Sequence, residues 1–241
     1  MSTKKHIFRI VSIVIILVSI CLVSCSRKPA TNKKNDDHML SLSDFKHADI
    51  GPATKAGTAT MNTNELEIVA GGSDIWGTHD EFHFAYKALT GDFDFSVQIL
   101  SLSAAHLYTK AGIMARTDLS DSSQHVYYQV FHDNSPRNKN NGGCEFQYRS
   151  EKAAEMKAIY PDPKTAGNQF DVAFPNCWVR LKRQGNVFES YFSNDGKKWR
   201  LYSTYTLKMP HELLVGMAVT AHNSTAYATA RFASVQLKNY N

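Results

Sequence analysis

Two histidines and two acids lie close together in the string SDIWGTHDEFHFAYK, which spans residues 73 to 87. His79 and His83 flank Asp80 and Glu81, so the order H-D-E-F-H is close to the zinc-binding signature H-E-x-x-H. That signature needs a helix, which places two histidines four residues apart on one face, and a glutamate directly after the first histidine. Here the glutamate comes one place late.

The residues that follow the string predict a strand instead of a helix. Phe82, Phe84 and Tyr86 alternate with smaller or polar residues at period two, which is typical of a half-buried strand. In a strand, His79 and His83 lie roughly 13 Å apart, so they could not share one ion. We therefore expect no zinc site here. Calcium remains an alternative, because Asp74 and Asp80 offer oxygen ligands, although loop aspartates are usually solvated or form turns.

The N-terminal segment has the layout of a secretory signal. Lys4, Lys5 and Arg9 precede an apolar run from residue 10 to residue 23. The run is short for a membrane span, although a simple signal anchor is the alternative. It ends in Leu-Val-Ser-Cys at residues 22–25, which resembles a bacterial lipoprotein signal. That resemblance implies cleavage before Cys25, acylation of its thiol, and a location in the bacterial cell envelope, lipid-anchored to a membrane on the periplasmic or outer side.

The charge of the chain argues against a nucleic-acid partner. Without residues 1–24 the formal net charge falls from +5 to +2, and the polar segment that follows carries that remainder. The folded body is therefore close to neutral, whereas nucleic-acid binding needs a basic surface. We expect a signal peptide over residues 1–24, a polar tether over 25–41 and one β-sandwich domain over 42–241.

Two cysteines remain in the folded body after Cys21 and Cys25 are assigned to the signal. They are Cys144 and Cys177, and an exported compartment would permit a disulfide between them. Each cysteine opens a strand-like run. If those two strands pair antiparallel, the thiols lie at opposite ends, so we do not expect the bond.

The body is rich in alternating segments and poor in helical periodicity. Its predicted strands are joined by short turns such as Gly91-Asp92, which indicates an all-β antiparallel meander folded into a two-sheet sandwich. One short segment, residues 150–158, has helical character. Ser193, Asp195, Gly196 and Trp199 follow the S-x-D-x-G-x-x-W spacing of the Asp-box, a structural hairpin that carries no evidence for catalysis.

Period-two counting sorts each predicted strand into an inward and an outward face. In KAGIMAR, for example, Ala111, Ile113 and Ala115 face inward. The outward residues are aromatic, amide and guanidinium groups, which suit a sugar: rings stack on a pyranose and planar groups bond adjacent hydroxyls. Ordinary solvent-facing positions are the alternative. The candidate ligand-binding residues are Asp74, Trp76, Arg116, Tyr127, Gln129, Gln147, Arg149, Thr220 and His222.

Several of these segments together resemble a known family. The strings GGSDIWGTHDEFHFAYKALTGDFDFSVQI, YTKAGIMAR, CEFQYR, WVRLKRQGNVFESYFSNDGKKW and VGMAVTAHN are similar to the concanavalin A-like lectin/glucanase group, and within it to bacterial regulation-of-enolase-like (DUF1349-type) domains. The resemblance covers about residue 45 to residue 237. It implies a two-sheet jelly roll with presumed carbohydrate binding, and it supplies no catalytic residues.

Three functions stay open at this point. The leading one is a non-catalytic carbohydrate-binding or accessory lipoprotein with a glycan or polysaccharide partner. A glycan-active hydrolase or lyase is the second, but no strand carries the paired carboxylates that jelly-roll glucanases use, so we assign no catalytic residue. A structural envelope protein with a protein partner is the third.

Overall fold

The computed structural model describes residues 42–62, 64–132, 143–161 and 169–240. The predicted signal peptide, the tether and Cys25 lie outside the described residues. Regular structure in the described part is almost all β-strand, after one 3-10 turn at Leu42–Asp44. None of its helices is long and apolar enough to cross a membrane.

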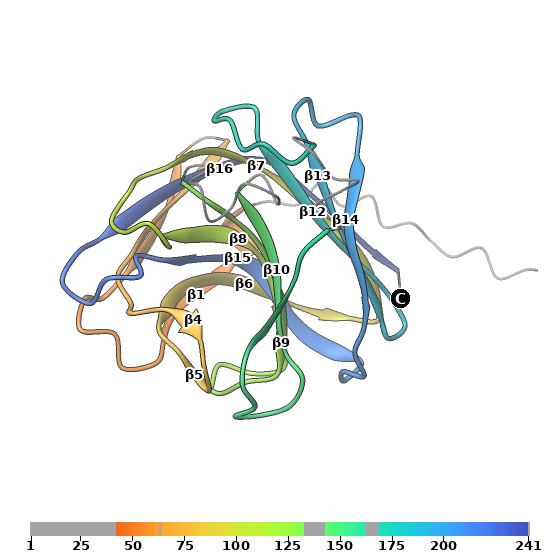
Figure 1. Cartoon of the computed structure of the whole chain (residues 1–241), viewed down its shortest axis with the longest axis horizontal. Coiled ribbons are helices and arrows are strands. Elements are labelled where there is room, and N and C mark those ends of the chain that lie inside the picture. Colours follow the sequence, from red (N-terminus) through yellow and green to blue (C-terminus); the bar gives the residue numbers. More distant parts are fainter. Residues whose placement is uncertain (1–41, 63, 133–142, 162–168, 241) are drawn as a thin grey trace, which may run out of the picture. The chain divides into compact units, whose positions relative to one another are not determined.

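Two seven-stranded sheets lie face to face (Figure 1). Every pairing between described strands is antiparallel. In spatial order, sheet A contains β1 (Lys46–Ile50), β6 (Phe82–Thr90), β15 (Glu212–Thr220), β8 (Lys110–Arg116), β9 (His125–Phe131), β10 (Cys144–Arg149) and β11 (Lys157–Ile159). Sheet B contains β14 (Arg200–Thr206), β13 (Val187–Ser193), β12 (Trp178–Gln184), β7 (Asp92–Leu102), β16 (Ala228–Tyr240), β3 (Glu65–Ala70) and β2 (Thr58–Asn62).

The prediction of an all-β two-sheet sandwich is therefore confirmed, although the simple meander is not. Among the described strands, β8 to β11, β12 to β14, and the pairs β2–β3 and β4–β5 follow one another in space as they do in sequence. The other neighbours, such as β6 with β15 and β7 with β16, are far apart along the chain. Gly91 makes the tight turn between β6 and β7 with a φ of 85°, a backbone conformation that favours glycine.

The core between the sheets follows the predicted alternation. Ala111, Ile113 and Ala115 of β8 face sheet B and pack in the main hydrophobic cluster. Met114 and Tyr127 lie on the opposite face of sheet A, in a second cluster with Phe82, Phe84 and Ala218. The inward and outward sets were therefore predicted correctly.

The prediction that the outward set faces solvent is wrong for six of the nine candidate residues. A short hairpin, β4 (Ile75–Trp76) with β5 (His79–Asp80), covers part of the outer face of sheet A, and its Ile75 packs in the second cluster. The strands β8 and β9 are consequently buried on both faces. The buried candidate residues are Arg116, Tyr127, Gln129, Gln147, Arg149 and Thr220.

Apart from the side-chain oxygens of Gln129 and Gln147, these buried polar groups bond to the chain around them. Arg116 donates to the carbonyls of Asp118 (2.8 Å) and Ser120 (2.5 Å). The Tyr127 hydroxyl donates to the Ala218 carbonyl at 3.0 Å, and Thr220 donates to the Glu81 carbonyl at 3.0 Å. These bonds fasten loops to the sheet, as expected of groups that lose their contact with water.

Residues 150–158 do not form the helix that their sequence suggests. The Arg149 guanidinium donates to the Ala154 carbonyl (3.0 Å), and the Ala153 amide donates to the Ser122 carbonyl (2.8 Å). Ala153 also has a φ of 59°, outside the helical region. These tertiary bonds take backbone groups that a helix would pair with one another.

The Asp-box hairpin is confirmed. The Asp195 carboxylate accepts hydrogen bonds from the amides of Lys197 (2.9 Å) and Lys198 (2.8 Å) and lies 2.9 Å from the Ser193 hydroxyl. These backbone bonds lower the pKa of Asp195 to about 2. Gly196 takes a positive φ of 67°, and the ring of Trp178 lies so close that a Cβ at this position would clash with it.

Cys144 and Cys177 are both free and buried. The reason we gave for this is wrong, because the strands that they open do not pair: β10 belongs to sheet A and β12 to sheet B. Burial raises the pKa of Cys144 to about 12 and raises that of Cys177 well above its usual value. The cysteines therefore act as small core residues.

A buried ion pair fastens the β4–β5 hairpin to sheet A. Asp80 of β5 and Arg149 of β10 have no exposed side-chain surface, and two guanidinium nitrogens each donate to one carboxylate oxygen at 2.7 Å. Arg149 Nη2 also donates to the Gly77 carbonyl at 3.0 Å, and this bond holds the tip of the hairpin. Such bidentate pairs fix orientation as well as charge.

Two further basic groups surround the same carboxylate. Arg116 Nη2 lies 3.8 Å and His125 Nδ1 lies 3.6 Å from Asp80 Oδ2. Burial lowers the pKa of Arg116 to about 10 and, together with the two arginines, lowers that of His125 to about 4, against the opposing effect of Asp80. His125 is therefore neutral at pH 7, and its Nε2 is buried without a partner.

We expect the substitution Asp80→Asn to destabilise the protein strongly, because it leaves the buried Arg149 guanidinium without its counter-charge. The free energy of unfolding should fall by about 3–5 kcal/mol, as measured by urea denaturation. As the control, Asp44→Asn breaks an exposed pair with Lys87 (3.2 Å) and should cost less than about 1 kcal/mol. Equal effects of the two substitutions would contradict this account of the ion pair.

We expect stability to fall with decreasing pH through the titration of His125. The unfolded chain binds a proton near pH 6.5, whereas the folded protein resists it until about pH 4, so protons favour unfolding in this window. His125 should reduce the free energy of unfolding by about 3 kcal/mol between pH 6.5 and pH 4. Comparing pH profiles of wild type and His125→Asn isolates this contribution, and the exposed-histidine variant His79→Asn should retain the wild-type slope.

Candidate functional site

A cleft opens on the part of sheet A's outer face that the β4–β5 hairpin leaves uncovered. Its volume is about 370 Å³. The hairpin, the segment before β8, strands β8 to β10 and the segments that follow β11 and β15 all contribute to it. The described residues that line it are Asp74, Trp76, His106, Tyr108, Lys110, Phe131, Glu145, Gln147, Tyr160 and His222.

One end of the cleft is held together by an ion pair and a histidine. Lys110 of β8 is almost fully buried and donates to Asp74 Oδ1 at 2.6 Å and to the Ile75 carbonyl at 3.2 Å. His222 Nε2 lies 3.0 Å from the other Asp74 oxygen. Burial raises the pKa of Asp74, but the bonds from His222 and Lys110 outweigh it, so the pKa is lowered overall. Asp74 is therefore a charged hydrogen-bond acceptor at neutral pH.

Aromatic rings form the walls of the cleft. His106 stacks on His222 with ring centroids 4.4 Å apart and an interplanar angle of 7°, and Tyr108 lies 5.3 Å from His222. Lys110 Nζ lies 5.7 Å from the centre of the Trp76 ring. Trp76, Tyr108 and Tyr160 keep 43%, 38% and 52% of their surface exposed, which is high for residues of this size. These rings offer flat apolar faces beside polar groups.

Glu145 of β10 forms the other end of the cleft. Its Oε2 accepts a hydrogen bond from the Tyr160 hydroxyl at 2.5 Å. Its Oε1 accepts from the amide nitrogens of Gln147 and, at 3.4 Å, Gln129. Glu145 and Gln129 are opposite each other in the β9–β10 pairing, so the strand register brings them together.

The structure brings four of the nine sequence-predicted residues into this cleft. Asp74, Trp76, Gln147 and His222 line it, and Gln129 lies buried behind Glu145. Arg116, Tyr127, Arg149 and Thr220 are enclosed in the bonds described above, where no ligand reaches them in this structure. Whether the four lining residues bind a ligand stays a prediction.

Sequence reasoning passed over six of the lining residues. Period-two counting from Ala111 and Phe146 places Lys110 and Glu145 outward, but neither was included among the candidate residues. His106, Tyr108 and Tyr160 lie outside strands, where that counting gives no direction. Phe131 ends β9, and its alternation with Val130 points outward, but it has no polar group to draw attention to it.

Calcium binding receives no support from the positions of the two aspartates. Asp74 pairs with Lys110 and His222, whereas Asp80 pairs with Arg149 behind the hairpin. Basic neighbours oppose a cation at these carboxylates. Within the ranges that the structure describes, no group of three or more His, Cys, Asp or Glu side chains is arranged to hold a metal ion.

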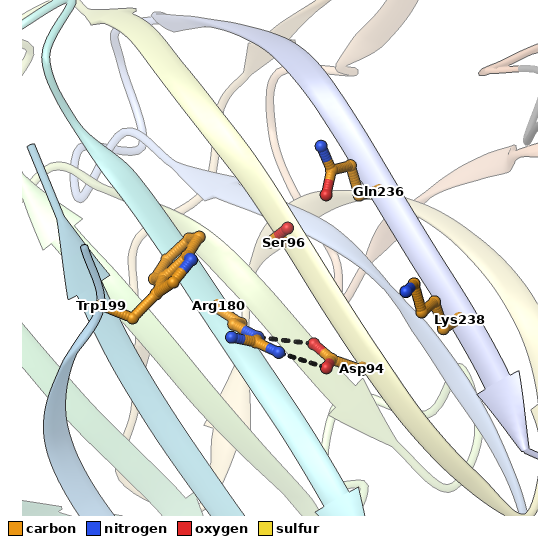
Figure 2. Close-up of a pocket in the computed structure, with 6 residues that line it drawn as sticks. All are labelled: Asp94, Ser96, Arg180, Trp199, Gln236 and Lys238. Carbon is orange, nitrogen blue, oxygen red and sulfur yellow. Dashed lines mark hydrogen bonds and ion pairs between the residues drawn. The ribbon is translucent and has the colours of Figure 1, made fainter. Parts of the chain in front are cut away.

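A smaller hollow lies on the outer face of sheet B. Figure 2 shows Arg180 of β12 and Asp94 of β7 facing each other, with Trp199 beside the guanidinium. Its volume is about 140 Å³, Arg180 Nε donates to Asp94 at 2.6 Å, and the Trp199 ring centre lies 5.4 Å from the guanidinium carbon. Asp94 is paired with Arg180, and the hollow is smaller with one ring among its lining residues, so the larger cleft is the stronger candidate.

The two antiparallel sheets and their crossing connections define a concanavalin A-like jelly roll. Within that class, residues 54–240 match the family model described as "Protein of unknown function (DUF1349)", and the chain belongs to this family. No curated protein sequence matches the chain.

Solved structures with similar folds share little sequence with this chain. A functionally unknown protein from Saccharomyces cerevisiae aligns with a TM-score of 0.62 and 15% identity, over 83% of this chain and 98% of that one. Lectin II from Ulex europaeus aligns at 0.50 and 9% identity, over 82% and 93%. The GH43 BlXynB protein from Bacillus licheniformis aligns at 0.52 and 13% identity, over 73% of this chain and 33% of that one. At these identities the likeness concerns the fold.

Proposed function

We propose that this chain is a non-catalytic carbohydrate-binding protein of the cell envelope, with the cleft on sheet A as its glycan site. The observation that carries the proposal is the combination of three exposed rings, Trp76, Tyr108 and Tyr160, with a polar floor. Rings bind the apolar faces of a sugar, while carboxylate and amide groups bond its hydroxyls. The lectin from Ulex europaeus has the same fold, which is compatible with this function.

The chemistry of the cleft favours binding over glycoside hydrolysis. A hydrolase needs a carboxylic acid that stays protonated near neutral pH beside a second, ionised carboxylate. Asp74 has a lowered pKa and is bound by Lys110 and His222, so it is unsuited to donate a proton. Glu145, the other acid among the described lining residues, is enclosed by three donors.

A glycan array followed by calorimetry with the full chain tests the proposal. We expect millimolar or tighter binding to at least one oligosaccharide, and a loss of about tenfold, or about 1.4 kcal/mol, in the variants Trp76→Ala and Tyr108→Ala. The matched control is Tyr240→Ala, which removes a similarly exposed ring from sheet B. Absence of binding to every glycan would favour a protein partner, and release of reducing or unsaturated sugar would favour an enzyme.

The N-terminal sequence supports a second part of the proposal, attachment to a membrane through lipid on Cys25. A single acyl chain binds membranes only marginally, so we infer that more than one chain holds the protein. Metabolic labelling of cells with an alkynyl fatty acid should label the wild-type chain, and Cys25→Ala should lose the label and leave the membrane fraction. Cys21→Ala is the control and should stay labelled, whereas retained label in Cys25→Ala would refute the anchor.

A further inference from the structure

The two carboxylates of the cleft differ in how their charge is compensated. Asp74 forms an ion pair with Lys110 at 2.6 Å. Glu145 instead takes its hydrogen bonds from neutral groups, namely the Tyr160 hydroxyl and the amides of Gln129 and Gln147. Among the described residues, no basic side chain forms an ion pair with Glu145. In the described part of the chain, this mostly buried carboxylate therefore has hydrogen bonds but no basic counter-group.

The two amides beside Glu145 present further unused acceptors. A carboxylate only accepts hydrogen bonds, so both amides must turn their nitrogens toward it and their oxygens away. The side-chain oxygens of Gln129 and Gln147 are both buried and have no hydrogen-bond partner. A buried carbonyl without a donor is costly, and native structures rarely leave one unmatched. Gln147 lines the cleft, so its buried oxygen lies at the cleft wall, where a donor on a ligand would supply the missing bond.

The charges and the aromatic ring at the Glu145 end of the cleft indicate which kind of hydrogen-bond donor a ligand should offer there. The described lining residues include two carboxylates against one lysine, so these residues together favour a positively charged ligand when their histidines are neutral. The exposed ring of Tyr160 is bonded to Glu145 through its hydroxyl, and aromatic faces attract cations. A neutral hydroxyl would satisfy Gln147 but would leave the charge of Glu145 unpaired.

We propose that the cleft recognises an amino sugar through its protonated amino group, which Glu145 and the side-chain oxygen of Gln147 hold beside the Tyr160 ring. This inference rests on the proposed carbohydrate-binding function and narrows its ligand class. The ammonium group supplies both the missing donor and the missing positive charge. The remaining sugar ring lies toward Trp76 and Tyr108, which supply the stacking faces.

Calorimetry of the full chain with three matched tetrasaccharides tests this proposal. They are β-1,4-linked glucosamine, which is cationic, β-1,4-linked N-acetylglucosamine, whose amine is blocked, and cellotetraose, which has hydroxyls only. We expect the glucosamine tetrasaccharide to bind at least about tenfold more tightly than the other two.

Two variants locate the preference within the cleft. Glu145→Gln keeps the shape of the side chain and removes its charge, so it should bring the three affinities within about twofold of one another. Glu189→Gln is the matched control, because Glu189 also accepts a hydrogen bond from a tyrosine, Tyr191 at 2.8 Å, but lies on sheet B. It should keep the wild-type preference. The wild-type comparison stands on its own if Glu145→Gln fails to fold.

The outcomes separate this proposal from the one on which it rests. Equal or tighter binding of the two uncharged tetrasaccharides, or array binding confined to glycans without an amino group, overturns the amino-sugar proposal and leaves carbohydrate binding in place. An unchanged preference in Glu145→Gln overturns the assignment to Glu145. Absence of binding to any glycan removes both proposals.

Discussion

The buried ion pair between Asp80 and Arg149 is the constraint on which the candidate site depends. Burying two charges costs several kcal/mol for each, and only good geometry with further hydrogen bonds repays that cost. Here the pair is bidentate, and Arg149 also bonds the hairpin tip at Gly77. The pair fixes one short hairpin on the sheet, and that hairpin carries Asp74 and Trp76 into the cleft.

The hairpin divides the outer face of sheet A into two parts with different roles. Beneath it, Phe82, Met114 and Tyr127 form a second hydrophobic cluster, with the arginines sealed among their own hydrogen bonds. Beyond it, Lys110 of β8 and Glu145 and Gln147 of β10 line the cleft with little of their surface exposed. Outward residues of sheet A thus hold the hairpin in place where it covers them, and line the cleft where it does not.

Two kinds of polar chemistry meet in the cleft. At the Asp74 end, charges are paired and the groups are held in place by Lys110 and His222. At the Glu145 end, hydrogen bonds are supplied by neutral groups, and two amide oxygens have no partner. The Asp74 end, whose groups are already paired, is suited to orient the rings and hydroxyls of a ligand. The Glu145 end, whose amide oxygens lack donors, is suited to a ligand with hydrogen-bond donors and positive charge.

The sequence by itself determined the sandwich, the inward and outward faces of its strands and the Asp-box hairpin, because these depend on local alternation and turn chemistry. It also brought Asp74, Trp76, Gln147 and His222 into the candidate set. Only the tertiary structure decided which outward residues line the cleft: Arg116 and Arg149 have the same parity as Lys110 and Gln147 but lie under loops that period-two counting cannot place. The residues that join the cleft from outside strands, His106, Tyr108 and Tyr160, were decided by chain connections between distant segments, for which the sequence has no local signal.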